Sequence, residues 1–110
     1  MDRKVSSLLS LCKRAGKLST GEFSCEKALQ RDKCRFLIIA TDASENTIKK
    51  FSNKALYYEV DFKIYETREE LSKSIGEANR VVISINDENF ANKIKDLLLL
   101  WTGKFQNRKI

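Results

Sequence analysis

Two glycines and several cations lie close together early in the chain, in the run Lys13-Arg14-Ala15-Gly16-Lys17-Leu18-Ser19-Thr20-Gly21-Glu22. A helix that begins near Gly21 would direct unpaired N–H groups and the positive end of its dipole outward, and both attract anions. Arg14, Lys17 and, one turn inside the helix, Lys27 would surround that end. The spacing therefore predicts a site for a phosphate-rich partner. The alternative is an ordinary turn with solvated basic side chains.

The elements that must position these residues follow from the hydrophobic pattern, which alternates between helical spacing and short solid apolar runs. Helical spacing predicts five helices, ending at about residues 15, 31, 58, 75 and 102. The solid runs 36–40 and 81–85 are typical of central strands covered on both faces, and 17–19 and 60–65 are shorter extended segments. This order predicts one α/β domain over residues 1–102, a three-layer α/β/α sandwich around a four-stranded mixed β-sheet, followed by a basic tail at 103–110.

Capping residues predict where these helices begin. Ser19-Thr20-Gly21-Glu22 and Thr67-Arg68-Glu69-Glu70 both match the Ser/Thr-x-x-Glu capping box, in which each side chain bonds a free N–H of the other's turn. The last helix would be capped by Asn86 or Asp87. The first capping box would fix the start of the helix that carries Lys27.

Composition favours an acidic partner and a reducing location. The net charge is +6, with the positive excess in the first 35 and last ten residues. Cys12, Cys25 and Cys34 form no Cys-x-x-Cys pair and no signal sequence is visible, so we expect a cytoplasmic protein with reduced thiols that act as small hydrophobes. The longest apolar run, 97–101, is far below the roughly 20 residues of a membrane span.

Several short motifs stand in the order of a known family. They are Ala15-Gly16-Lys17, Gly21 with Lys27, the run 36–40 followed by Asp42-Ala43-Ser44-Glu45-Asn46-Thr47, residues 71–76, and Asp87-Glu88-x-Phe90-Ala91-x-Lys93. Over about residues 5–100 the chain resembles the kink-turn-binding ribosomal protein family, most closely its small bacterial YlxQ-like branch. The resemblance implies a three-layer fold that binds RNA at sharply bent internal loops.

The helix start departs from the family pattern. The family reads sheared guanine–adenine pairs with Gly-x-Asn-Glu-x-x-Lys, and here Gly21 and Lys27 match while Phe23 and Ser24 replace the Asn and Glu. A carboxylate hydrogen bond to a base edge is worth about 1.5–3 kcal/mol, so its loss would lower affinity roughly tenfold to a hundredfold. Ser24 can still accept one bond, and a general RNA-binding function remains expected.

Other contacts each have a structural alternative. Phe23 would stack on a base or, the interpretation we favour, anchor the core beneath the helix. Asp42 and Ser44 follow a central strand, where ligand-facing loops gather, but both also fit helix capping. Arg80, in a short polar loop where kink-turn binders have an apolar segment, would contact phosphate or stack on a base. The expected RNA contacts are Arg14, Lys17, Gly21, Glu22, Phe23, Ser24, Lys27, Arg31, Ala43, Ser44, Asn46, Gly76 and Arg80.

An enzyme is not expected, because the chain has no histidine, no Gly-x-Ser-x-Gly elbow, no Walker-type loop and no metal-spaced cluster. We therefore expect no cofactor, metal or small-molecule substrate. The predicted function is non-enzymatic binding of structured RNA, of kink-turn or ribosomal type, with ribosome association. The alternative is a protein-interaction module that kept the fold and lost kink-turn recognition. Its support is the Phe23/Ser24 replacement and an apolar patch at 97–101, where Leu99 and Leu100 face away from the main stripe.

Overall fold

The computed structural model describes residues 1–102, with side chains through Leu98. Nine elements alternate along the chain, as the sequence predicts. They are α1 (Arg3–Arg14), β1 (Leu18–Thr20), α2 (Glu22–Gln30), β2 (Phe36–Ile39), α3 (Glu45–Tyr57), β3 (Phe62–Ile64), α4 (Arg68–Ser74), β4 (Val82–Ile85) and α5 (Glu88–Thr102). The predicted helices and strands are thus confirmed, with boundaries shifted by a few residues.

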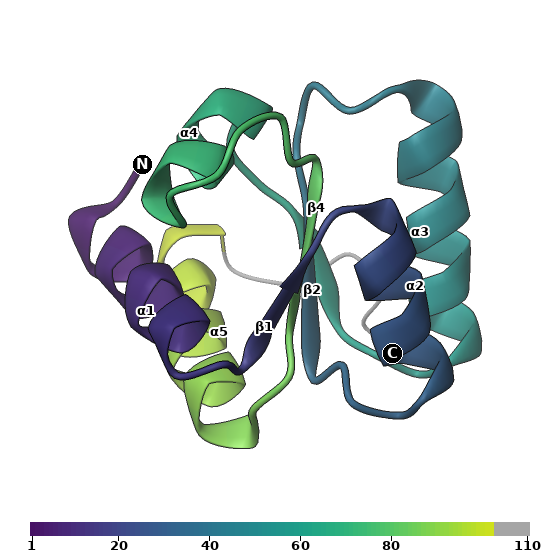
Figure 1. Cartoon of the computed structure of the whole chain (residues 1–110), viewed down its shortest axis with the longest axis horizontal. Helices are drawn as coiled ribbons and strands as arrows, with labels where there is room; N and C mark the ends of the chain where they lie inside the picture. Colours follow the sequence, from purple (N-terminus) through teal and green to yellow (C-terminus); the bar gives the residue numbers. More distant parts are fainter. Residues whose placement is uncertain (103–110) are drawn as a thin grey trace.

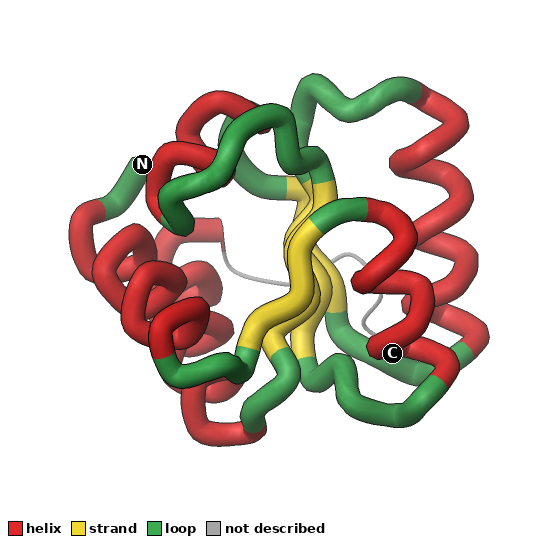
Figure 2. Tube along the Cα trace, in the orientation of Figure 1, coloured by secondary structure: helices red, strands yellow, loops and turns green. Residues whose placement is uncertain are grey.

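The four strands form one mixed sheet in the order β1-β4-β2-β3. β4 pairs antiparallel with both β1 and β2, while β2 and β3 are parallel and joined through α3. Helices α1, α4 and α5 cover one face and α2 and α3 the other, which confirms the three-layer sandwich (Figures 1 and 2). Because β1 is the first strand in this order, it is an edge strand of the sheet. α2 follows it directly in the chain.

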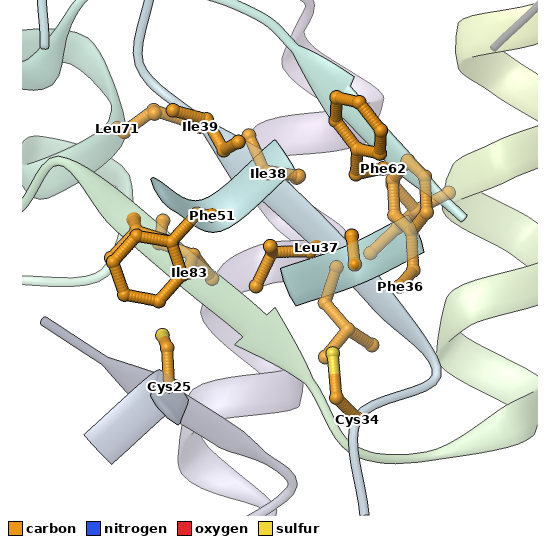
Figure 3. Close-up of a cluster of buried hydrophobic side chains, with 14 of the residues drawn as sticks. Cys25, Cys34, Phe36, Leu37, Ile38, Ile39, Phe51, Phe62, Leu71 and Ile83 are labelled. Carbon is orange, nitrogen blue, oxygen red and sulfur yellow. The ribbon is translucent and has the colours of Figure 1, made fainter. Parts of the chain in front are cut away.

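The core lies on both faces of the two central strands. Every residue of β2 and β4 is buried, which confirms that solid β-branched runs indicate two-sided burial. Phe36 and Phe51 are fully buried aromatic members of the cluster drawn in Figure 3. This packing fixes α2 against the sheet, because Cys25, Ala28 and Leu29 form the buried face of that helix.

The three cysteines belong to this core. Cys12, Cys25 and Cys34 are free and buried. Burial raises the pKa of Cys12 to about 12 and that of Cys34 to about 11, since desolvation disfavours a thiolate. The thiols are therefore neutral at physiological pH and behave as small hydrophobes, as expected.

Glycines and side-chain caps mark the ends of several helices. Gly16 and Gly76, in the left-handed region at φ 71° and 69°, follow the ends of α1 and α4. The Thr67 side chain caps α4 by accepting from the N–H of Glu70. Asp87, and not Asn86, caps α5, accepting from the N–H of Phe90 at 3.0 Å.

The prediction of a capping box that begins at Ser19 is wrong. Ser19 lies within β1 opposite Ser84, and its hydroxyl accepts from Asn86 Nδ2 at 2.9 Å. Strand pairing extends through Thr20, so α2 begins later, with Gly21 as its N-cap and no side chain bonding the first turn. The N–H groups of that turn are left without a side-chain acceptor.

Several expectations fall outside the described residues. They are the orientation of the apolar side chains of Leu99, Leu100 and Trp101, and the basic tail at 103–110. Within the described part, no helix combines the length and the apolar character of a membrane span.

Candidate functional site

A groove of about 670 Å³ runs between the edge strand β1 and the outer surface of α2, and we call it the β1–α2 groove. It brings together Lys17, Phe23, Ser24, Lys27 and Arg31, five of the residues predicted from the sequence. Ser24, Lys27 and Arg31 lie on one helix face because they are spaced by three and four residues. The remaining lining residues are Gly16, Leu18, Ser19, Ala28, Lys33 and Asn86.

The groove carries uncompensated positive charge. Lys17, Lys27, Arg31 and Lys33 line it, and no carboxylate does. None of the ion pairs formed among the described residues includes any of these four cations. A concave surface lined by one sign of charge concentrates the field and attracts polyanions.

Phe23 is not a core anchor. It is 74% exposed, which overturns the interpretation that we favoured from the sequence. The reason is helical geometry, since Phe23 precedes the buried Cys25 by two residues and so points about 200° away from it around α2. Its ring lies in the groove, with Lys27 Nζ 5.2 Å from the ring centroid in a cation–π contact.

The start of α2 approaches its surroundings closely through backbone atoms. Gly21 has φ 87° and ψ 162°, a region that only glycine adopts readily, and its N–H donates to Val82 O. A Cβ at this position would lie 2.8 Å from Arg80 Nη1. The guanidinium of Arg80 therefore lies directly beside the uncapped helix start.

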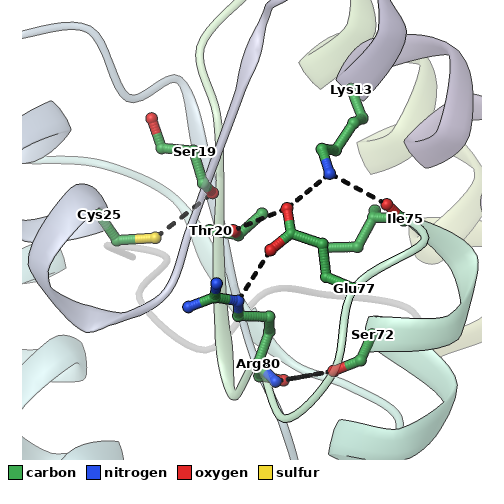
Figure 4. A network of polar contacts seen from close by, with 8 residues as sticks. All are labelled: Lys13, Ser19, Thr20, Cys25, Ser72, Ile75, Glu77 and Arg80. Atoms are coloured by element: carbon green, nitrogen blue, oxygen red, sulfur yellow. Dashed lines mark hydrogen bonds and ion pairs between the residues drawn. The ribbon is translucent and has the colours of Figure 1, made fainter.

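Glu77 holds Arg80 in this position (Figure 4). Its carboxylate accepts from Arg80 Nε at 2.9 Å, from Lys13 Nζ at 2.5 Å and from Thr20 Oγ1 at 3.3 Å. The hydrogen bond from Lys13, followed by that from Arg80, lowers the pKa of Glu77. Lys13 also donates to Ile75 O, so it is engaged within the protein. Arg80 also forms an ion pair with Glu77, but through Nε, so its terminal nitrogens Nη1 and Nη2 take no part in that ion pair.

Replacing Glu77 by Gln is expected to lower the free energy of unfolding by about 1 kcal/mol at pH 7, because the amide keeps the shape and loses the charge. The pKa of Glu77 is lower in the folded state, so its stabilising effect is present above the ordinary value of 4.5 and is lost as the pH falls through the folded pKa. Urea unfolding at pH 7 and pH 3 should therefore show a difference between wild type and variant that shrinks at pH 3.

A matched control for this prediction is Glu59→Gln. Glu59 is exposed and belongs to none of the ion pairs in the described part of the chain. It should leave stability unchanged at both pH values. A loss for Glu77→Gln that stays undiminished at pH 3 would show that the charge is not responsible.

The loops at the same end of the sheet as Gly21 are fixed mainly by contacts with one another. Arg68 donates to Asp42 O at 2.7 Å and to Asn79 Oδ1 at 3.3 Å, and the N–H of Arg68 donates to Asp42 Oδ1. Asp42 thus joins the loop after β2 to the start of α4, and it is Ser44 that caps α3. Charged groups in these loops are largely satisfied within the protein.

The other predicted contact residues in this region differ in exposure. Ser44 and Asn46 are exposed at the start of α3, and Gly76 is exposed after α4, whereas Ala43 is buried. Glu22 is exposed, and its carboxylate accepts from Thr47 Oγ1 at 3.3 Å across to α3. The contact between Glu22 and Thr47 places the start of α3 beside the start of α2. None of these predicted residues lines the β1–α2 groove.

Arg14 is separated from the other predicted residues. It lines a second groove, between α1 and α4, together with Lys73 and several serines. Lys33 and Asn86 are among the lining residues of the β1–α2 groove that were not predicted as RNA contacts. Lys33 returns toward α2 after Asp32 adopts a left-handed conformation, and Asn86 is brought there by the register of β4 with β1.

Comparison with known proteins gives matches over most of the chain. The model of the Ribosomal protein L7Ae/L30e/S12e/Gadd45 family matches residues 3–95. The chain is 41% identical over 91 residues to the RNA-binding protein YlxQ of Bacillus subtilis (strain 168), which covers 83% of this chain and 91% of that protein. It is 40% identical over 97 residues to the RNA-binding protein YlxQ of Enterococcus faecium, covering 87% and 92% of the two chains.

Solved structures share the same fold. A Bacillus halodurans protein of unknown function superposes with a TM-score of 0.84 at 36% identity, covering 88% of this chain and 98% of that chain. The Giardia lamblia 15.5kD RNA binding protein superposes with a TM-score of 0.72 at 16% identity, covering 91% and 92%. At that identity the second likeness concerns the fold alone.

Proposed function

Because the chain belongs to the Ribosomal protein L7Ae/L30e/S12e/Gadd45 family, we propose that it is a cytoplasmic, non-enzymatic RNA-binding protein. The relatives in Bacillus subtilis and Enterococcus faecium that carry the name RNA-binding protein align over more than four fifths of this chain, which supports the proposal. The partner that we propose is structured RNA, of kink-turn or ribosomal type. Association with the ribosome is part of the same proposal.

The observation that carries the proposal is the β1–α2 groove, with its four unpaired cations and no carboxylate. Phosphate contacts from Lys and Arg supply most of the affinity of RNA-binding proteins and position the chain on its partner. The uncapped start of α2 adds backbone N–H donors, and Arg80 adds terminal guanidinium nitrogens beside Gly21. In this arrangement the groove binds the backbone of a folded RNA, and the loops at Gly21, Ser44 and Arg80 contact its flanks.

Recognition of kink-turns by the helix start depends on residue 24. Ser24 is exposed and lines the groove. A carboxylate there would be directed into the groove and could accept from guanine edges. Ser24→Glu is therefore expected to raise the ratio of kink-turn to straight-duplex affinity roughly tenfold. Ser24→Gln, of similar size and without charge, should raise it less. Loss of binding to both RNAs with an unchanged ratio would contradict docking through this helix start.

The proposal itself is tested by titrating the purified chain against a kink-turn RNA, a straight duplex and a single strand, each at two salt concentrations. We expect the kink-turn RNA to bind with the highest affinity, with a steep decrease as salt rises. Indifference to all three RNAs would reject RNA binding and favour the protein-interaction module.

A further inference from the structure

Phe23 differs from the other phenylalanines of the described chain. Phe36, Phe51 and Phe62 are buried and Phe90 is partly buried against the core, whereas Phe23 is 74% exposed. Its position on the outer face of α2 leaves the ring without a role in packing the sheet. An exposed ring at this one position calls for an explanation outside the core.

The surroundings of the ring suggest its partner. Lys27 Nζ lies over the ring, 5.2 Å from its centroid, and Lys17 and Arg31 line the same groove. Aromatic rings set among cations are the stacking platforms of proteins that bind unpaired nucleotides, where cations hold phosphates and the ring holds a base. The groove, at about 670 Å³, is within the roughly 300–1,000 Å³ of ordinary small-ligand clefts.

The chemistry of a phenylalanine ring selects between paired and unpaired RNA. The ring has no hydrogen-bond donor or acceptor, so it cannot read the edges of a base pair. In an A-form duplex the faces of the bases are covered by their neighbours, and only an unstacked base offers a face to the ring. Phe23 therefore adds affinity only where the RNA has a base outside a helix.

We propose that the β1–α2 groove takes an unpaired nucleotide of a structured RNA, with its base stacked on Phe23 and its flanking phosphates bound by Lys27 and Arg31. The inference rests on the proposed function and specifies the part of the RNA that the groove receives. It assigns to Phe23 the recognition of a base face, in place of the base edges that an amide side chain would read at this position.

The test compares two RNA hairpins that differ by one nucleotide. One carries a single unpaired 2-aminopurine in its stem, and the other has the same stem fully paired. The wild-type chain should bind the bulged hairpin more tightly, with quenching of 2-aminopurine fluorescence. Phe23→Leu should weaken binding to the bulged hairpin roughly 5- to 100-fold and abolish the quenching. Binding to the paired hairpin should change less than about twofold.

Two variants separate stacking from other roles. Phe23→Tyr keeps a ring and should keep both the affinity for the bulged hairpin and the fluorescence quenching. If Phe23 made only apolar contacts, the variant would not need to keep the quenching. Lys27→Ala removes the cation and should weaken both hairpins to a similar extent, with a flatter salt dependence. The exposed position of Phe23 makes its variants suitable for binding measurements, and their folding is checked by circular dichroism.

The outcomes separate the inference from the proposed function. Equal loss on both hairpins with Phe23→Leu, or no loss on either, would overturn the stacking proposal while RNA binding stands. Equal wild-type affinity for the two hairpins would also overturn the stacking proposal while RNA binding stands. A wild-type chain that binds neither hairpin would overturn the stacking proposal, and titration with the kink-turn RNA would then decide whether the proposed function stands.

Discussion

Replacing Lys17, Lys27 and Arg31 together by alanine is expected to lower RNA affinity roughly 100- to 500-fold at 0.1 M salt. These three cations line the β1–α2 groove without an internal ion pair. Each phosphate contact contributes about 0.7 to 0.9 to the slope of log affinity against log salt, so three contacts contribute about 2 to 3. Titrations at several salt concentrations should show both the loss of affinity and the flatter slope.

The matched control removes the same charge from another surface. Arg3, Lys4 and Lys93 line a groove between α1 and α5. Replacing these three by alanine should change RNA affinity less than about threefold. Equal losses in the two triple variants would mean that net charge alone governs binding, and the groove would lose its assigned role.

Phe51→Ala is expected to have the largest effect on stability. Phe51 is fully buried on the face of the sheet that α2 and α3 cover, in the cluster of Figure 3. Truncation of a buried phenylalanine removes its burial free energy and leaves a cavity, which together cost about 3–5 kcal/mol. Domains of this size have roughly 5–15 kcal/mol of stability in total, so the variant should unfold at much lower urea.

Tyr57→Ala on the same helix serves as the control for that loss. Tyr57 is 79% exposed and makes a T-shaped contact with Tyr58, so the cost should be at most about 1 kcal/mol. Similar losses in Phe51→Ala and Tyr57→Ala would contradict the assignment of Phe51 to the core.

Sequence reasoning succeeds where the information is local. The solid runs that became β2 and β4 indicated burial on both faces, and the structure buries every residue of both strands. Ser24, Lys27 and Arg31 were all expected RNA contacts, and their spacing by three and four residues on one helix brings them to one groove. The exposure of Phe23 was also present in that spacing, because Cys25, Ala28 and Leu29 define the opposite, buried face. The preference of phenylalanine for burial outweighed this signal in our prediction.

Sequence reasoning fails where distant segments compete with a local pattern. Ser19 and Glu22 match a capping box, but pairing of Ser19 with Ser84 draws it into β1. Lys13 belongs to the basic run that opens the predicted anion site, yet Glu77, 64 residues away in the chain, binds its ammonium group. Periodicity and motif spacing contain no information about such a contact. Arg14 is close to Lys17 in sequence but lines a different groove, together with residues of α4 that are distant in the chain.

Amide chemical-shift mapping of the isotope-labelled chain during titration with a kink-turn RNA would locate the bound RNA on the protein surface. In the proposed arrangement the RNA lies in the β1–α2 groove. We expect the largest shifts within residues 17–33 and at Arg80, and small shifts at Arg3, Lys4 and Lys93. Shifts concentrated between α1 and α5, with residues 17–33 unchanged at saturation, would contradict it.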